Sequence, residues 1–102
     1  DEAEVYCTEA LETQRRVLGN DHTDTLTSII NMGLLLKSQD KYDEAEVYLA
    51  EALEAIRRLL GNENPNTLSS INNMAELYDA WGNPEEAQKY RDMLPEEEES
   101  TP

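Results

Sequence analysis

The sequence predicts an all-α fold, an antiparallel helix-hairpin solenoid of five helices, and three observations lead to it. Residues 1–42 align with residues 43–84 without a gap, and 22 of the 42 positions are identical. Internal repetition at a period of about 20 to 50 residues is typical of solenoids, whose units bury their apolar faces against one another. Within each unit, apolar residues recur at helical spacing, and Gly, Asn and Pro mark the places where helices would end and begin.

The first expected helix covers residues 1–18, because its opening DEAEVYCTEALE returns from residue 43 as DEAEVYLAEALE. Two positions on its apolar side differ between the copies, since Cys7 corresponds to Leu49 and Gln14 corresponds to Ile56. The smaller or polar side chain reduces apolar burial, which is worth roughly 25 cal/mol per Å². We therefore expect the first helix to be more exposed and more mobile than its copy.

The second expected helix covers residues 24–39 and follows the turn residues Leu18-Gly19-Asn20. Asp40, which comes after it, is a weaker helix stop than Gly82 at the equivalent position, because Gly adopts left-handed backbone conformations more readily. The alternative is a swapped assembly in which this helix runs on into the next one.

The third expected helix covers residues 43–60 and has the clearest apolar stripe. Asp43 and Glu44 suit its positive N-terminal end, and Arg57 and Arg58 suit its last turn, just before Gly61. The stripe consists of Ala45, Tyr48, Leu49, Ala52, Leu53, Ile56 and Leu60.

The fourth expected helix covers residues 66–81, and the fifth covers residues 84–94. Asn64 can cap the fourth helix and Pro65 suits its start, while Gly82 breaks the chain at its end. Near this end, Tyr78 and Trp81 are expected to pack in the core and at the turn rather than to bind a ligand. Residues 1–94 thus form the predicted helical domain. Residues 95–102 are expected to be a disordered acidic tail, because they have nothing apolar to bury.

The helices resemble those of tetratricopeptide repeats. In the stretch MGLLLKSQDKYDEAEVYLAEAL, Gly33 lies inside one helix, Tyr42 at the turn, and Ala45, Leu49 and Ala52 in the next helix, as in the family. The second unit offers Met74, Ala75, Tyr78, Gly82 and Ala87. The repeat is 42 residues long instead of the usual length of about 34. It therefore resembles the long-repeat subclass found in kinesin light chains and nephrocystin-like arrays.

This resemblance implies a superhelix with the helix order B-A-B-A-B. Residues 24–39 and 66–81 are its A helices, which would line a concave groove that holds an extended or helical peptide. The other three helices are B helices. Short connections between consecutive helices make neighbours antiparallel.

The composition restricts the class of partner. The formal net charge is −15, from 8 basic and 23 acidic residues. This charge argues against binding to nucleic acid or to an anionic membrane surface, because such binding needs Lys and Arg to neutralise phosphates. No apolar run is long enough to span a membrane. A charged partner should be basic.

The single cysteine and the lack of an Asn-x-Ser/Thr sequon favour a cytoplasmic location.

The two A helices keep one side and vary the other. The kept side carries Leu26, Ile29, Met32 and Leu36, with counterparts Leu68, Ile71, Met74 and Tyr78. The varied side carries Thr27, Ile30, Leu34, Lys37 and Ser38, with counterparts Ser69, Asn72, Glu76, Asp79 and Ala80. In the implied superhelix the varied side would line the groove, although an ordinary solvated face would vary too.

An identical asparagine lies beside the varied side in each unit, Asn31 and Asn73. An asparagine amide can hydrogen-bond a peptide backbone whatever its sequence, because it offers both donors and an acceptor. The alternative is that both residues hold neighbouring helices together.

These observations predict a non-enzymatic scaffold that binds a peptide or partner segment in the groove. Ile30 and Leu34 would form an apolar pocket with Lys37 at its edge, and Glu76 and Asp79 would make the other end acidic, to suit a basic residue. The alternative is a structural segment of a longer array that self-associates as a homodimer through its first helix. The apolar surface for that contact would come from Val5, Cys7, Leu11 and Val17.

No cofactor, metal or catalytic residue is expected. His22 lies between Asp21 and Asp24 in an interhelix loop, but one His with two flexible carboxylates does not have the spacing of a metal site. Cys7 has neither a His nor a cation close to it in the sequence, so it lacks the surroundings of a catalytic thiol.

Overall fold

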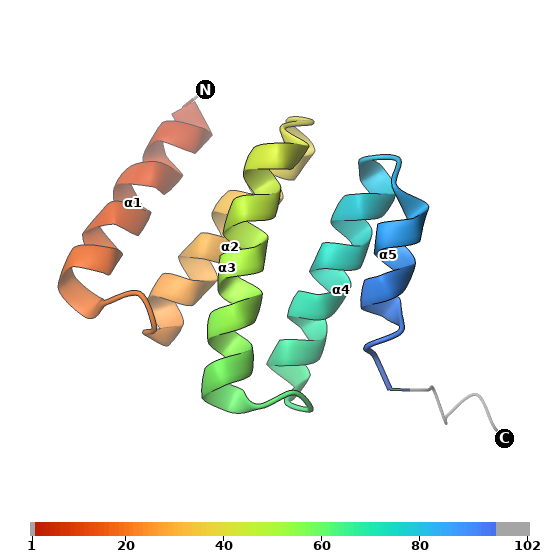
Figure 1. Ribbon diagram of the computed structural model, residues 1–102. Coiled ribbons are helices and arrows are strands. Elements are labelled where there is room, and N and C mark those ends of the chain that lie inside the picture. The colour runs from red at the N-terminus through yellow and green to blue at the C-terminus, as the bar shows by residue number, and fades with distance from the viewer. Residues whose placement is uncertain (1, 96–102) are drawn as a thin grey trace, which may run out of the picture.

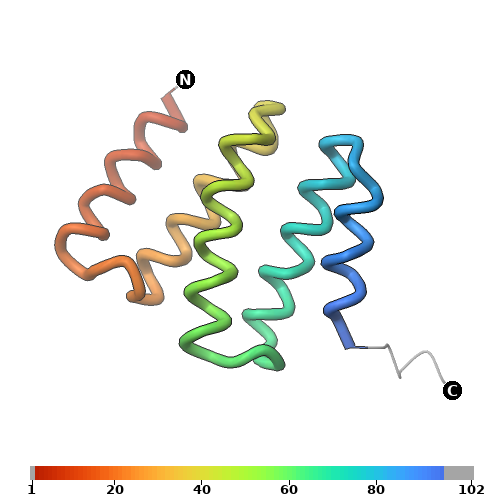
Figure 2. The backbone as a smooth tube through the Cα atoms, in the orientation of Figure 1, coloured from red at the N-terminus to blue at the C-terminus, as the bar shows by residue number. Residues whose placement is uncertain are grey.

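The computed structural model describes residues 2–95, and this part of the chain consists of five α-helices joined by short turns. The helices are α1 (Glu2–Leu18), α2 (Thr23–Ser38), α3 (Tyr42–Leu60), α4 (Pro65–Ala80) and α5 (Pro84–Arg91). They run alternately up and down, with α1 and α5 at opposite ends of the molecule and α2 passing behind α3 in the view of Figures 1 and 2. The predicted all-α solenoid is confirmed.

The observed bounds lie within one residue of the predicted ones except at the end of α5. This helix stops at Arg91 rather than at residue 94. The amides of Met93 and Leu94 donate hydrogen bonds to the carbonyls of Tyr90 and Arg91. Each bond reaches back three residues, as in a turn, instead of the four residues of an α-helix. Pro95 follows and disfavours the helical conformation in the residue before it. The predicted tail lies, from residue 96 on, outside the described residues.

Side-chain caps begin three of the helices. Asn64 accepts a hydrogen bond from the amide of Asn66 at 2.8 Å, as predicted, and Asn83 accepts one from the amide of Glu86 at 3.4 Å. At the start of α2, Nδ1 of His22 accepts from the amide of Asp24 at 3.0 Å. The residue predicted only to lie in a loop is therefore a helix cap, in the position that Asn64 holds in the next unit.

The chain reverses at Asp40, so α2 and α3 do not merge into one helix. Asp40 has a φ of 65°, in the left-handed region, where Gly82 of the next unit has 82°. Its carboxylate accepts a hydrogen bond from the Tyr42 hydroxyl at 2.8 Å. A non-glycine residue thus makes the same turn with a local side-chain contact.

The core follows the side of the A helices that is kept between the two units. Leu26, Ile29, Met32 and Leu36 are all buried, as are Ile71, Met74 and Tyr78, whereas Leu68 is half-buried. These residues pack in two clusters, one around α1, α2 and α3 and one from α2 to α5. Trp81 packs at the turn against Tyr78 and Tyr42 but remains 39% exposed.

The first helix is less enclosed than its copy, as predicted. Leu11 is the buried residue of α1, whereas α3 buries Ala45, Leu49, Ala52, Leu53, Ala55 and Ile56. The difference arises because α3 packs against both α2 and α4, whereas α1 packs against α2. Gln14, at the position of Ile56, is half-buried, and its side-chain oxygen accepts a hydrogen bond from Ser28.

Two predictions about burial were wrong. Leu11 was expected to belong to the open apolar surface of the first helix, but it is 3% exposed because it packs on α2 and α3. Leu60 was expected in the buried stripe of the third helix, but it is 46% exposed because α3 ends there, beside an open cleft.

A close contact between α2 and α3 explains the glycine in the first A helix. A Cβ atom at Gly33 would lie 2.7 Å from Cγ and Cδ2 of Leu49. In the next unit Ala75 replaces the glycine and Arg91 replaces the leucine. Arg91 reaches Asp79 of α4 instead of packing in the core. The two substitutions therefore compensate for each other.

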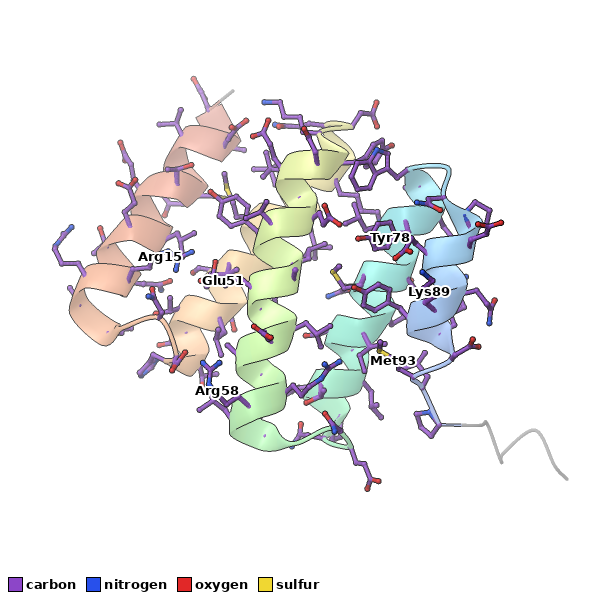
Figure 3. The ribbon with its side chains drawn as sticks, in the orientation of Figure 1. Arg15, Glu51, Arg58, Tyr78, Lys89 and Met93 are labelled. Carbon is purple, nitrogen blue, oxygen red and sulfur yellow. The ribbon has the colours of Figure 1, made fainter. Side chains whose placement is uncertain are left out.

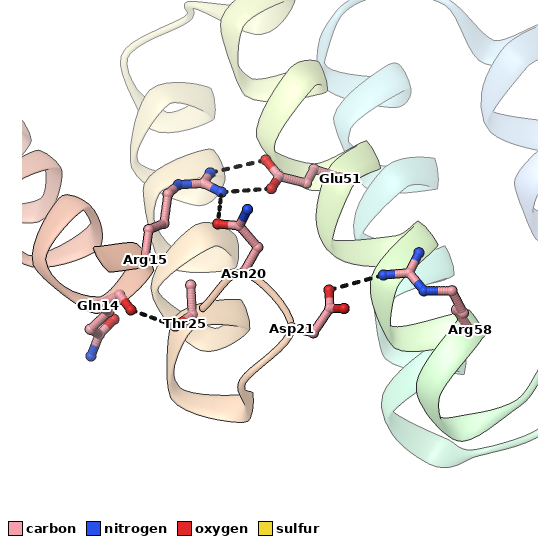
Figure 4. Close-up of polar contacts among 7 residues, drawn as sticks. All are labelled: Gln14, Arg15, Asn20, Asp21, Thr25, Glu51 and Arg58. Carbon is pink, nitrogen blue, oxygen red and sulfur yellow. Dashed lines mark hydrogen bonds and ion pairs between the residues drawn. The ribbon is translucent and has the colours of Figure 1, made fainter. Parts of the chain in front are cut away.

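Polar contacts tie α1 and its following turn to α3 (Figure 4). The two terminal nitrogens of Arg15 donate to the two carboxylate oxygens of Glu51 at 2.8 and 3.0 Å. Arg15 also donates to the side chain of Asn20 at 2.8 Å, and Arg58 pairs with Asp21 at 2.9 Å. The hydrogen bond with Glu51 raises the pKa of the Arg15 guanidinium. The contacts of Arg15 with Glu51 and of Arg58 with Asp21 thus connect two consecutive B helices, although an A helix lies between them in the sequence.

Candidate functional site

The candidate site is a cleft between the two A helices, with the C-terminal end of α3 as its third wall. Its volume is about 330 Å³. It is lined by Thr23, Leu26, Thr27, Ile30, Ile56, Leu59, Leu60, Asn66, Ser69, Ser70 and Asn73. The cleft arises because α2 and α4 begin beside the end of α3, where that helix no longer fills the space between them.

Four of the predicted groove residues come together in this cleft: Thr27 and Ile30 from α2, and Ser69 and Asn73 from α4. The other seven are not among its lining residues. These are Asn31, Leu34, Lys37, Ser38, Asn72, Glu76 and Asp79. The cleft therefore occupies the N-terminal half of the A helices, while the predicted stripe extends over their full length.

The third wall was missed in the sequence prediction. Leu59 and Leu60 of α3 are 49% and 46% exposed, and both line the cleft. The sequence did contain one sign of this wall. Two leucines stand directly before Gly61, although the apolar stripe of the helix needs only one of them. Only the packing of three helices shows that they face the same space as Ile30.

The two equivalent asparagines have different surroundings. Asn73 is half-buried in the cleft, whereas Asn31 is exposed outside it. Neither amide forms a hydrogen bond with another residue of the described segment. Their polar atoms are therefore open to a partner, and no hydrogen bond among these residues supports the alternative that they hold helices together.

Both carboxylates at the acidic end of the predicted groove have internal contacts, but only one of them forms an ion pair. Glu76 accepts a hydrogen bond from the side chain of Asn72 at 3.1 Å. Asp79 forms an ion pair with Arg91 of α5, and this contact raises the pKa of the Arg91 guanidinium. Of the two carboxylates, Glu76 is thus the one that forms no ion pair among residues 2–95, although its charge acts on Arg91.

The structure gives no arrangement for metal chemistry in the part of the chain that it describes. No group of three or more His, Cys, Asp and Glu side chains in residues 2–95 is placed to hold a metal ion. Cys7 is half-buried on α1, and the His22 ring caps α2. In the same segment, no helix is long and apolar enough to cross a bilayer.

Comparison with known proteins gives matches of sequence and of structure. The family model described as tetratricopeptide repeat matches residues 1–54 and, in an overlapping second match, residues 26–90. No curated protein matches the sequence significantly. Among solved structures, the crystal structure of BtubC (BKLC) from P. vanneervenii matches with a TM-score of 0.85 and 27% sequence identity. That match covers 91% of this chain and 37% of BtubC, so the chain spans little more than a third of that protein's length.

Proposed function

Because this chain belongs to the tetratricopeptide repeat family, whose members generally mediate protein–protein interactions, we propose that its cleft between α2 and α4 binds an extended segment of a partner protein. The 42-residue spacing also supports assignment to the long-repeat subclass that resembles kinesin light chains and nephrocystin-like arrays. The proposed role is that of a non-enzymatic, cytoplasmic scaffold.

The cleft carries this proposal because it combines exposed apolar side chains with an available amide. Leu59 and Leu60 are each about half exposed, and Ile30 lies opposite them. Covering them with an apolar side chain of a partner would be favourable by roughly 25 cal/mol per Å² of apolar surface. Asn73 can then hydrogen-bond the partner's backbone, which fixes its position without requiring a particular sequence.

The negative charge of the chain indicates which residues the rest of the bound partner segment should contain. At a net charge of −15, long-range attraction favours a partner with basic residues. An apolar anchor in the cleft would place the following residues along α4 toward Glu76. A Lys or Arg in that part of the segment would meet a carboxylate that forms no ion pair with a basic side chain of residues 2–95.

A peptide selection with matched variants tests the proposal. Display selection of random peptides on the chain should enrich segments with an apolar anchor and a basic residue. The affinity of a selected peptide should fall severalfold in Leu60→Ser, in Asn73→Ala and in Glu76→Lys. Val47→Ser is the control, because Val47 is 64% exposed on the same helix as Leu60 and does not line the cleft. Equal affinities for Leu60→Ser, Asn73→Ala and Val47→Ser would refute binding in the cleft.

Self-association through α1 is a second candidate. Val5, Tyr6 and Val17 are 56%, 74% and 68% exposed on this helix, while Cys7 is half-buried. A homodimer would cover this apolar surface. Size-exclusion chromatography with light scattering should then give twice the chain mass of 11.6 kDa, and Tyr6→Ser should shift it toward the monomer. A monomer at all concentrations would contradict this candidate.

A further inference from the structure

The two units place a glutamate at the same repeat position, Glu4 and Glu46, but give its carboxylate different partners. In the first unit, the ammonium of Lys41 lies 3.1 Å from Oε1 of Glu4, so that the start of α3 is tied to α1. Glu46 is the counterpart of Glu4 in the second unit, but Asn83 stands in the place of Lys41. The acid has been kept between the copies, whereas its cation has not.

Glu46 instead has one internal partner. Its Oε2 atom accepts a hydrogen bond from the Tyr78 hydroxyl, and Tyr78 is only 7% exposed. Burial of the ring, together with this hydrogen bond, raises the pKa of Tyr78 well above its ordinary value. No basic side chain among residues 2–95 pairs with Glu46, and its second oxygen has no hydrogen bond in that segment.

Beside Glu46 lies a hollow of about 490 Å³ with aromatic walls. It is lined by Glu46, Tyr78, Trp81, Gly82, Asn83 and Glu86. Trp81 stacks on Tyr78 with ring centroids 5.8 Å apart and an angle of 12° between the planes. Their counterparts in the first unit are Gln39 and Leu36, so the aromatic rings occur only where the internal cation is missing.

The other carboxylate that lines the hollow, Glu86, already has an internal cation. Glu86 accepts a hydrogen bond from the ammonium of Lys89 at 2.8 Å, one turn further along α5, and Lys89 is largely exposed. Figure 3 shows Tyr78 and Lys89 on the same side of the α4–α5 pair. Glu46 is therefore the carboxylate that can take a new cation without displacing an existing one.

From this comparison we propose that the hollow between α3, α4 and α5 binds a basic side chain, arginine or lysine, of a partner protein. The cation would take the place relative to Glu46 that Lys41 has relative to Glu4. Carboxylates bind such groups through charge-assisted hydrogen bonds, and the half-exposed indole of Trp81 adds a cation–π contact. This site lies at the C-terminal end of α4, whereas the cleft lies at its N-terminal end. It is a second point of attachment that does not depend on the cleft.

The experiment uses Trp81 as its own reporter, because it is the single tryptophan of the chain. The indole N–H resonance is followed by NMR while the peptide acetyl-Gly-Gly-Arg-Gly-Gly-amide is added to about 10 mM, since one side-chain contact gives millimolar affinity. A second titration replaces arginine with lysine. A third uses citrulline, which keeps the size of arginine without its charge. Magnesium chloride at the same ionic strength tests for a free ion.

The variants use the repeat as a matched control. Glu46→Gln keeps an acceptor for the Tyr78 hydroxyl but removes the charge, and it should weaken the arginine peptide about fivefold or more. Glu4→Gln makes the same change at the equivalent position of the first unit and should leave the affinity unchanged. If Glu46→Gln does not fold, Asn83→Lys provides the second test, because it supplies the internal ammonium and should block binding.

Saturable shifts with arginine or lysine, together with weaker binding by Glu46→Gln or Asn83→Lys, would support the site. The proposal fails if citrulline or magnesium reproduces the shift. It also fails if neither basic peptide gives a saturable shift, or if Glu46→Gln binds as well as Glu4→Gln. The peptide selection tests binding in the cleft between α2 and α4 independently. A negative NMR titration would therefore reject only the site in the hollow.

Discussion

Arg15 of α1 donates hydrogen bonds to both carboxylate oxygens of Glu51 of α3, and this bidentate ion pair links two neighbouring B helices. The same position in the next unit shows what the pair contributes. Arg57 corresponds to Arg15, but it meets the sulfur of Met93 at 3.8 Å, because Met93 stands where Glu51 would recur. The second B–B junction therefore lacks the ion pair of the first.

Restoring the ion pair should stabilise the chain. Met93→Glu places a carboxylate beside Arg57 and should raise the free energy of unfolding by about 0.2–1 kcal/mol, the range for exposed ion pairs. Thermal unfolding should show Tm rising by a few degrees, and the gain should shrink in high salt. Met93→Gln is the neutral control. Equal Tm values for the two variants would show that Arg57 does not form the pair.

Closing the small space at Gly33 should destabilise the chain despite the better helix propensity of alanine. The new methyl group would lie 2.7 Å from the Leu49 side chain, and overpacking of a core costs roughly 1–3 kcal/mol. In urea unfolding we expect Gly33→Ala to lower the free energy of unfolding. In a Leu49→Ala background the same change should raise it, because the clash is gone and the helix propensity of alanine remains.

The reverse change in the second unit serves as the control for Gly33. Ala75→Gly should lower the free energy of unfolding by about 1 kcal/mol, since Ala75 is buried in a helix without such a clash. A stabilising effect of Gly33→Ala in the unchanged background would contradict the close contact between α2 and α3.

The cap at the start of α2 can be tested by replacing the ring that forms it. His22→Ala removes the acceptor for the Asp24 amide and should cost about 1 kcal/mol in the free energy of unfolding. His22→Asn should keep or improve the stability, because Asn64 caps α4 in the same way at the equivalent position. Chemical denaturation monitored by circular dichroism measures both. Equal loss in the two variants would mean that the side chain at this position does not cap the helix.

Alkaline pH should weaken the fold through Tyr78. Burial of the ring, followed by its hydrogen bond to Glu46, raises the pKa of its hydroxyl in the folded state above the ordinary value of 10.0. The stabilising contribution is complete below pH 10 and is lost as the pH rises further, since the unfolded chain releases this proton first. The free energy of unfolding should therefore fall above pH 10.

The comparison for this prediction is Tyr78→Phe, which cannot ionise at this position. Its stability should be lower than that of the unchanged chain at neutral pH, and the difference should narrow at pH 11. Because burial also raises the pKa of Tyr90, the variant should keep part of the alkaline loss. A constant difference between the two proteins from pH 8 to pH 11 would contradict the role of Tyr78.

Most of the helical architecture could be predicted from local patterns. The spacing of Leu26, Ile29 and Met32 identified the buried side of α2, because helical periodicity alone decides which side chains share a face. The cap at Asn64 followed from residue type. The end of α5 was predicted three residues too late, because its copy in α3 continues, whereas the last residues before Pro95 form turns.

The candidate site was predicted only in part. Thr27, Ile30, Ser69 and Asn73 line the cleft, but Leu59 and Leu60 were missed, since they belong to a B helix whose end faces the same space. Asp79 was expected to attract a basic partner, yet Arg91 already pairs with it across the α4–α5 hairpin. Such pairings depend on the distance between side chains of different helices, which periodicity does not encode.

The sequence by itself determined the repeat, the five helices and the side of each A helix that enters the core, because these follow from local spacing and turn chemistry. Tertiary structure decided which carboxylates keep an internal cation and where the stack leaves a cleft open. Glu4 is paired with Lys41, whereas its copy Glu46 faces Asn83 and a hollow. Identical residues of the two repeats thus have different surroundings, because the residue that each contacts lies in another segment, whose sequence differs between the repeats.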